Sequence, residues 1–243
     1  MQADRPRAVA ACLPAGGGEA ARLLGEAGFA LAATAETVGE AMRRVDECQP
    51  GLLLADAVLP GGDGVALARR IDAAALNVYP CIVLLRPAGL RLPGEASLAA
   101  MNAAALDRPA SAKALLDAVE SLRSRAPALS GARAQRLSAL MDDMGIPAHP
   151  GRDMLSAAVA LAWRDRRRLH NLRDEIYPAA GRPFGRTAAQ AERAIRHVID
   201  AAWRTGEIDR QQAIFGDTID ARRGRPTCGE MIAQLADILR WEG

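Results

Sequence analysis

Hydrophobic and polar positions alternate in two different ways along the chain, and the change falls near its middle. Up to about residue 124, a short apolar run is followed by an amphipathic stretch five times in succession. The apolar runs have the length of strands, and the amphipathic stretches have the apolar spacing of helices. This alternation predicts a parallel sheet with helices on both faces. The expected strands are 8–13, 29–34, 51–56, 80–86 and 103–107, and the expected helices are 18–27, 36–48, 63–74, 96–102 and 110–124.

The second half of the chain has helical periodicity only. Between Ser121 and Arg133 the pattern breaks into Arg, Ser, Pro and Gly, which indicates a linker. The sequence therefore predicts an α/β domain at 1–122, a linker at 123–132 and an all-α domain at 133–243. The six helices expected in the all-α domain are 133–144, 152–166, 169–178, 188–204, 208–214 and 227–240.

Composition excludes several classes of protein. The longest apolar runs are too short to span a bilayer, and the first residues lack a signal-peptide stretch, so we expect a cytoplasmic protein with no membrane partner. The four cysteines are scattered without a C-x-x-C pair, which favours buried free thiols over a metal site. No nucleophile-base pair is evident, so neither an enzyme nor a bound cofactor is expected.

The net charge of +2 is unevenly divided. Residues 1–119 carry 11 basic and 13 acidic side chains, whereas residues 120–243 carry 20 and 16. The excess of basic side chains makes the second half the better candidate for nucleic-acid contact. Such contact depends on local clusters of basic residues rather than on the total charge.

One segment of the first half resembles the two-component receiver family. The run from Leu52 to Gly64 has a strand that ends in Asp56, followed by Pro-Gly-Gly-Asp-Gly, a turn that leads into a helix. The resemblance implies a flavodoxin-like receiver domain in which Asp56 is the phosphoacceptor.

The rest of the receiver chemistry is missing. Receivers hold a divalent cation with two acids after the first strand, and phosphoryl transfer needs that cation. We therefore expect that Asp56 is not efficiently phosphorylated and that no cation is bound, with Arg108 as the remnant of the switch. The residues at the family's functional positions are Cys12 and Leu13 for the two acids, Leu85 for the hydroxyl, Ala105 for the aromatic and Arg108 for the lysine.

A nucleotide site is an alternative for this domain. The residues from Gly16 to Ala21 follow a predicted strand and fit a relaxed G-x-G-x-x-A pattern, and Glu36 ends the next strand. Such a loop can cradle a pyrophosphate while the acid holds a ribose hydroxyl. Three glycines can equally replace the lost metal loop.

A second site is predicted on the helix that starts near residue 188. Thr187 and Gln190 form a capping box, and Gly206 ends the helix. Apolar residues follow one face, namely Ala191, Ala194, Ile195, Val198 and Ala202. The opposite face carries Gln190, Arg193, Arg196, His197 and Arg204, with Glu192 beside them.

This basic helix fits a helix-turn-helix. A helix at 169–178 and a turn through Gly181, Pro183 and Gly185 precede it. In such a layout the second helix enters the major groove of double-stranded DNA, where Arg can bond guanine and Glu can accept from cytosine. Phosphate contacts are expected from Arg186 and from a cluster made of Arg164, Arg166, Arg167 and Arg168.

Most of 137–242 also resembles the effector domain of the stage-zero sporulation response regulator A family. The resemblance rests on Gly145-Ile146-Pro147-Ala148-His149, Tyr177-Pro178, Glu192-Arg193-Ala194-Ile195-Arg196-His197, Ala202-Trp203, Gly206-x-Ile208-Asp209 and Phe215-Gly216. It implies that Glu192, Arg193 and Arg196 contact base edges with His197 nearby. It also implies a homodimer on DNA and a phosphotransfer protein or sister regulator as a further partner. Gln190 departs from the Arg that is usual in the family.

These observations together predict a sequence-specific transcription regulator controlled independently of efficient Asp phosphorylation. Two alternatives remain open. One is an antagonist that forms mixed dimers with a functional regulator, although it would have no need for a basic recognition face. The other is a nucleotide-sensing receiver that controls DNA binding.

Overall fold

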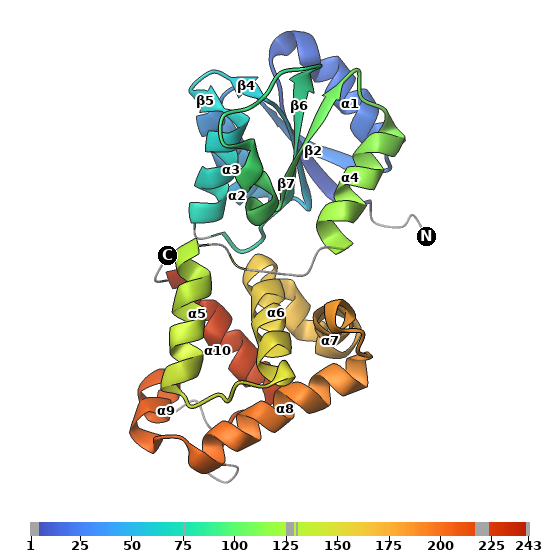
Figure 1. Ribbon diagram of the computed structural model, residues 1–243. Helices are drawn as coiled ribbons and strands as arrows, with labels where there is room; N and C mark the ends of the chain where they lie inside the picture. Colours follow the sequence, from blue (N-terminus) through green and yellow to red (C-terminus); the bar gives the residue numbers. More distant parts are fainter. Residues whose placement is uncertain (1–4, 75, 125–128, 130, 217–223, 242–243) are drawn as a thin grey trace. The chain divides into compact units, whose positions relative to one another are not determined.

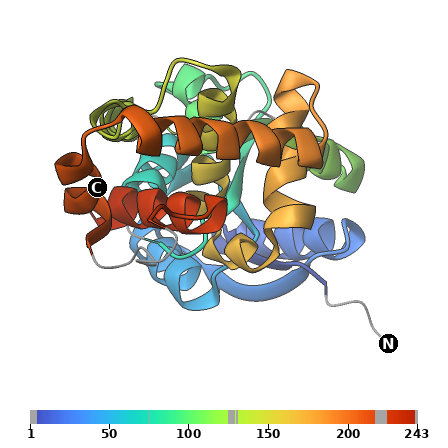
Figure 2. The same cartoon turned by 90° about the horizontal axis from the view of Figure 1, so that it is seen from below.

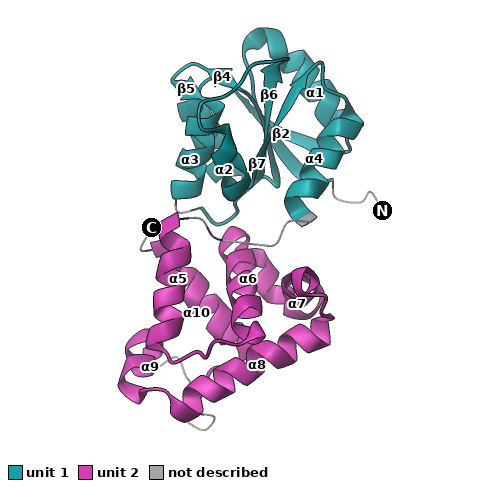
Figure 3. Ribbon diagram, in the orientation of Figure 1, with its two compact units in different colours: residues 1–125 teal, residues 126–243 magenta. Residues whose placement is uncertain are grey.

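The computed structural model describes all residues except 1–4, 75, 125–128, 130, 217–223 and 242–243 (Figure 1). The chain divides into two compact units, unit 1 at residues 1–125 and unit 2 at residues 126–243 (Figure 3). Positions 125–128 and 130 of the expected linker lie outside the described residues. In the described part of the chain, no helix has both the length and the apolar character needed to cross a membrane.

A five-stranded parallel sheet forms the centre of unit 1. Its strands are β1 (Arg7–Ala11), β2 (Ala30–Ala35), β3 (Leu52–Asp56), β6 (Cys81–Pro87) and β7 (Ala103–Arg108). They lie in the order β2-β1-β3-β6-β7, which is the order of flavodoxin-like folds. The central strand β3 is buried along its whole length, because helices cover both faces of the sheet. The predicted α/β architecture is confirmed.

Helices cover this sheet in two groups. They are α1 (Gly17–Glu26), α2 (Val38–Cys48), α3 (Gly64–Ala73) and α4 (Ala112–Ser124), with the 3-10 segments η1 (Pro14–Gly16) and η2 (Glu95–Met101). α1 packs with α4, whereas α2, α3 and η2 pack together on the other face (Figure 1). A small hairpin of β4 (Val58–Leu59) and β5 (Gly62–Asp63) joins β3 to α3.

The segment predicted as a helix at 96–102 differs from expectation. It is the 3-10 helix η2, which starts after Gly94 and ends before Asn102. Both flanking residues have left-handed backbone angles, which a continuing α-helix cannot contain. The segment is therefore confined to two short turns.

Unit 2 is helical throughout its described residues. Its α-helices are α5 (Gly131–Asp143), α6 (Pro150–Arg164), α7 (Tyr177–Gly181), α8 (Ala188–Thr205), α9 (Ile208–Phe215) and α10 (Cys228–Trp241). α6 is the central helix, since ten of its 15 residues are buried. It packs against α8 and α10. The predicted all-α fold of this domain is confirmed, although the helix expected at 169–178 is replaced by several shorter segments.

The prediction of a single helix at 169–178, as the first helix of the helix-turn-helix, is wrong. The chain there forms the 3-10 helix η3 (Arg166–Asn171), the π-helical turn η4 (Leu172–Ile176), α7 and the 3-10 turn η5 (Arg182–Phe184). Pro178 lies in the first turn of α7, where its missing N–H costs nothing, so a new helix begins there.

The turn into α8 is tight. A Cβ on Gly181 would lie 2.7 Å from the carbonyl oxygen of Arg186 and 3.1 Å from the Cβ of Ala191. The Arg186 N–H donates a hydrogen bond of 3.0 Å to the Gly181 carbonyl. A glycine is therefore required where α7 crosses α8, and the helix-turn-helix layout is present with a short first helix.

Candidate nucleic-acid interface and receiver-like site

α8 begins at the predicted capping box. The Gln190 backbone N–H donates a hydrogen bond of 3.3 Å to the Thr187 hydroxyl, and the Thr187 N–H donates one of 2.9 Å to the Gln190 Oε1. The box satisfies two backbone N–H groups at the helix start. The carbonyl end of the Gln190 side chain is thus engaged, while its amide nitrogen remains available for a contact.

The inner face of α8 packs on α6. Its buried residues are Ala191, Ile195, Val198, Ile199 and Ala202, so four of the five predicted positions are confirmed. Ala194 is only partly buried, and the start of α6 crosses α8 beside its carbonyl group. A Cβ on Gly151 would lie 2.2 Å from the Ala194 carbonyl oxygen. Any residue other than glycine would therefore clash with α8 at this position.

The outer face of α8 is exposed, and the helix lies in front of the other helices of unit 2 in the view of Figure 2. Gln190, Arg193, His197 and Arg204 lie on this face, and Arg186 is exposed just before the helix. Among the described residues, no acidic side chain pairs with the guanidinium groups of Arg186, Arg193 or Arg204. The face therefore carries three positive charges without compensation, which is the electrostatic character of a DNA-binding surface.

One flank of the same helix is charge-compensated. Arg196 forms an ion pair with Glu192, and Arg225, in the segment before α10, forms one with Asp200. These side chains and Tyr177 line a cleft of about 380 Å³ between α8 and the start of α10. Arg196 and Arg193, although both on α8, thus have different electrostatic surroundings.

Two histidines connect α6 with the outer face of α8. His149 is the N-cap of α6, and the Gly151 N–H donates a hydrogen bond of 3.0 Å to its Nδ1. The ring of His149 lies beside that of His197, with 5.0 Å between the ring centroids. The N-terminus of α6 is therefore held against the exposed helix.

In unit 1, Asp56 lies at the carboxyl end of β3 and its side chain is 7% exposed. The Leu13 N–H donates a hydrogen bond of 3.0 Å to its Oδ2, and Arg108 Nη2 donates one of 2.6 Å to its Oδ1. Both carboxylate oxygens therefore have partners from the chain itself.

Arg108 lies between two carboxylates. Its Nε is 3.2 Å from Oε2 of Glu19, at the start of α1. A Cβ on Gly16 would lie 3.2 Å from Arg108 Nη2 and 3.4 Å from Asp56 Oδ2. Gly16 and Gly17 have ordinary right-handed helical angles, so it is space rather than backbone freedom that favours glycine at residue 16.

The remaining neighbours of Asp56 are apolar or neutral. Burial, together with the negative charge of Asp56, raises the pKa of the Cys12 thiol to about 12. Leu85 lies opposite Asp56 on β6 and is buried. Neither side chain offers the oxygen ligands that a hard cation requires.

Comparison with known proteins places the second unit in a family. Residues 137–239 match the family described as "Sporulation initiation factor Spo0A C terminal". This segment belongs to the Spo0A C-terminal family. The match covers this segment alone, and unit 1 has the strand order of flavodoxin-like folds.

Unit 1 is similar to solved receiver domains at low identity. The signal receiver domain of the response regulator NarL from Mycobacterium tuberculosis is 19% identical, with a TM-score of 0.43, and the match covers 51% of this chain and 100% of that one. A CheY-like receiver domain from Methylobacillus flagellatus is 18% identical, with a TM-score of 0.42 and coverages of 49% and 98%. A LuxR-family DNA-binding response regulator from Staphylococcus aureus is 19% identical, with a TM-score of 0.40 and coverages of 48% and 98%.

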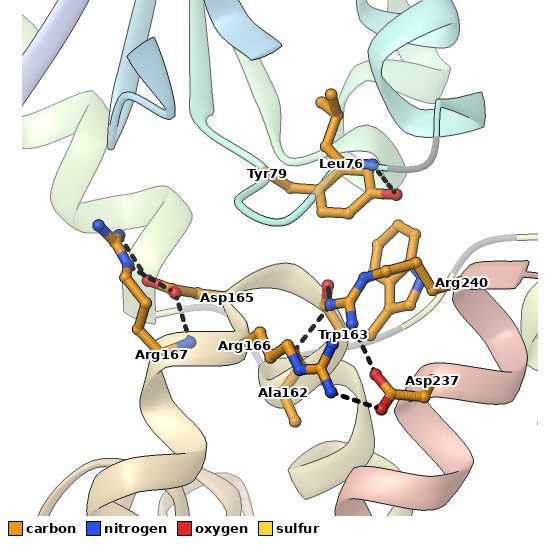
Figure 4. A network of polar contacts seen from close by, with 9 residues as sticks. All are labelled: Leu76, Tyr79, Ala162, Trp163, Asp165, Arg166, Arg167, Asp237 and Arg240. Atoms are coloured by element: carbon orange, nitrogen blue, oxygen red, sulfur yellow. Dashed lines mark hydrogen bonds and ion pairs between the residues drawn. The ribbon is translucent and has the colours of Figure 1, made fainter. Parts of the chain in front are cut away.

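The arginine cluster predicted to contact phosphates does not lie on the α8 face of the Spo0A-type domain. It follows the carboxyl end of α6, whereas α8 crosses the amino end of α6 at Gly151. A helix of this length puts the two ends about 20 Å apart. Two of the four arginines also have acidic partners (Figure 4): Arg166 donates to Asp237 at 2.9 Å, and Arg167 donates twice to Asp165, at 2.9 and 2.8 Å.

A buried arginine caps the carboxyl end of α6. Arg240 donates hydrogen bonds of 3.3 and 2.7 Å to the carbonyl oxygens of Ala162 and Trp163, and one of 2.9 Å to Asp237 (Figure 4). The last carbonyls of a helix need such donors. Arg240 therefore stabilises the carboxyl end of α6.

Three charged residues at the two sites were missed by sequence reasoning. Glu19 had been considered only as part of a glycine-rich pattern, and Asp200 and Arg225 had been given no role. For Asp200 a signal existed, since it lies four residues after Arg196 on the same side of the helix. For Arg225 no local signal existed.

Proposed function

We propose that the protein is a sequence-specific DNA-binding transcription regulator in which α8 reads the major groove without a requirement for phosphorylation of Asp56. The observation that carries the proposal is the exposed face of α8, where Arg193 and Arg204 have no acidic partner among the described residues, while the inner face of the helix is fixed on α6. A guanidinium that is already free pays no cost of breaking an ion pair when it meets DNA.

Individual roles follow from position on α8. Arg193 lies on the exposed face in the amino-terminal third of α8 and is proposed to donate two hydrogen bonds to a guanine. Arg196 and Glu192 contact bases at its edge, where Glu192 can accept from a cytosine amino group. His197 and Arg186 lie beside these residues and contact the backbone, and the amide nitrogen of Gln190 faces the DNA at the helix start.

Control of this activity differs from that of a phosphorylated receiver. Arg108 neutralises Asp56 from within the chain, and the Leu13 N–H satisfies the other oxygen. The residues around Asp56 do not fit a divalent cation, because Cys12 keeps its proton at neutral pH and Arg108 holds the carboxylate oxygen that a cation would need. We propose that unit 1 binds neither a phosphoryl group nor a cation at this site.

The decisive experiment is a fluorescence-anisotropy titration of the untreated full-length chain at one stated salt concentration. It compares duplexes with and without the DNA sequence element that the Spo0A family binds, called the box below. We expect preference for the box without a phosphodonor. Equal affinity for both duplexes would overturn the proposed function, and preference that appears only after phosphorylation would overturn the proposed mode of control. Sedimentation of the complex tests the expected homodimer on DNA.

A further inference from the structure

The cleft beside α8 includes residues that have no role in the base contacts described above, among them Asp200 and Arg225. It has a volume of about 380 Å³ and lies between α8 and residues 225–229. Its floor is apolar, with the buried residues Tyr177, Ile199 and Pro226. Its mouth carries the two ion pairs Glu192–Arg196 and Asp200–Arg225.

Both pairs at the mouth lie in contact with water. The side chains of Arg225 and Asp200 are 43% and 36% exposed, and those of Arg196 and Glu192 are 58% and 29% exposed. Ion pairs of such exposure contribute little to stability, so either arginine can exchange its carboxylate for a better partner. A phosphate accepts two parallel hydrogen bonds from one guanidinium and is such a partner.

The position of Arg225 sets it apart from other exposed arginines. Arg225 comes from outside α8, yet its partner Asp200 lies on that helix, two turns after Glu192. The guanidinium of Arg225 is therefore placed beside the exposed face that carries Arg193. A duplex whose major groove receives α8 brings one of its phosphate backbones to this side of the helix.

We infer that Arg225 is a phosphate-binding residue and that the segment at 225–229 is a second element of the DNA interface. Arg225 donates to a backbone phosphate at the mouth of the cleft, and Asp200 competes with that phosphate for the guanidinium. Asp200 thereby weakens binding to every sequence, which leaves the contacts of α8 to decide between sequences. This inference rests on the proposed function, since it assumes that α8 enters the major groove.

Two substitutions test the inference, because an ion pair that served only the fold would make both of them lower the affinity for DNA. Arg225→Ala is expected to lower affinity several-fold, equally for box and scrambled duplexes, and to reduce the slope of log K against log salt by about 0.9. Asp200→Asn removes the competitor and keeps the shape of the side chain, so affinity for both duplexes is expected to rise several-fold. If the pair served only the fold, both changes would lower affinity.

Controls separate charge and folding from the proposed contact. Arg22→Ala removes an exposed, ion-paired arginine from unit 1 and is expected to leave both affinities unchanged. The melting temperature of each variant is measured as well. If Arg225→Ala has a lowered melting temperature, its loss of binding is not interpreted and Asp200→Asn decides. The expected gain in affinity of Asp200→Asn cannot result from unfolding. Unchanged affinity in Arg225→Ala, or lower affinity in Asp200→Asn, overturns the inference.

Two further outcomes have separate meanings. Tight binding of inorganic phosphate at constant ionic strength, lost in Arg225→Ala but without effect on DNA affinity, would assign the cleft to a free anion and overturn the DNA contact. A wild-type chain that prefers the box, together with an unchanged Arg225→Ala, rejects this inference alone. A wild-type chain that binds no duplex rejects the proposed function and the inference together.

Discussion

The Arg108 guanidinium reaches across β6 from the end of β7 and binds Asp56 at the end of β3, with 2.6 Å between Nη2 and Oδ1. The ion pair thus joins two strands that are not neighbours in the sheet. Glu19 contacts the same guanidinium from α1. Asp56 and Glu19 thus share one positive charge that the chain itself supplies.

Removal of Arg108 is expected to destabilise unit 1. In Arg108→Ala the buried carboxylate of Asp56 loses its cationic partner and keeps only neutral ones, such as the Leu13 N–H, and breaking a pair of this kind costs on the order of 3 kcal/mol. Denaturant unfolding of the full chain measures the loss. Asp56→Asn in the Arg108→Ala background is expected to recover part of it, because the uncompensated charge is gone. Equal stability of wild type and Arg108→Ala would show that the pair contributes nothing.

Phosphodonors are expected to leave Asp56 unmodified. Incubation of the chain with acetyl phosphate and Mg²⁺, followed by intact-mass measurement, should show no added phosphoryl group, and Mg²⁺ alone should not raise the melting temperature. The matched variant combines Cys12→Asp, Leu13→Asp and Arg108→Lys, which restores the acids and the lysine of the receiver pattern. A Mg²⁺-dependent rise in melting temperature is expected for that variant only. Stoichiometric labelling of Asp56 in the wild type would contradict the prediction.

Arg193 and Arg186 are expected to differ in the kind of affinity they supply. Arg193→Ala should cost about 1–3 kcal/mol on the box and little on a scrambled duplex, because it removes a base contact. Arg186→Ala should lower affinity by the same factor on both duplexes, because a phosphate contact carries no sequence information. Anisotropy titrations at matched salt compare the two variants, each of which loses one positive charge. Equal losses for Arg193→Ala on both duplexes would remove it from the base-reading set.

Alkaline pH is expected to destabilise unit 1 through Cys12. Burial raises the pKa of this thiol from 9.0 to about 12 in the folded chain. Below pH 9 the thiol is protonated in both states, so its contribution to stability is fully present. As pH rises from 9 toward 12 the unfolded chain ionises and the folded chain does not, so the free energy of unfolding falls. Denaturant unfolding should show a smaller fall for Cys12→Ala, and parallel curves for the two proteins would contradict this cause.

Local patterns predicted much of the fold. The apolar runs of β3 and β6, the capping box of Thr187 and Gln190 and the apolar stripe of α8 each depend on residues a few positions apart. The segment after α6 was predicted wrongly for a local reason as well. Leu172 and Ile176 have helical spacing, but Pro178 starts a new helix and the turn before it widens to a π-helix.

Pairings between distant residues could not be predicted. The receiver resemblance singles out Asp56 and Arg108 separately without pairing them, and nothing in the sequence places Glu19 beside them. Asp200 and Arg225 lie 25 residues apart and meet because α10 begins beside α8. The position of the arginine cluster away from α8 has the same origin, since the direction of α6 decides which of its ends lies near α8.

The crossing of α6 and α8 makes Gly151 the most sensitive position of the interface. A Cβ there would lie 2.2 Å from the Ala194 carbonyl oxygen and 2.9 Å from a methyl group of Val198, so Gly151→Ala must push the two helices apart. Overpacking of this kind costs about 1–3 kcal/mol or more, and it displaces the helix that carries Arg193. We expect a lower melting temperature and weaker binding to the box. Gly39→Ala in α2 is the control, because no atom lies within 4 Å of its added Cβ, and its gain in helix propensity should keep or raise stability. A Gly151→Ala chain with wild-type stability and affinity would show that α8 can shift along α6 without loss, and the fixed presentation of its outer face would then have to be abandoned.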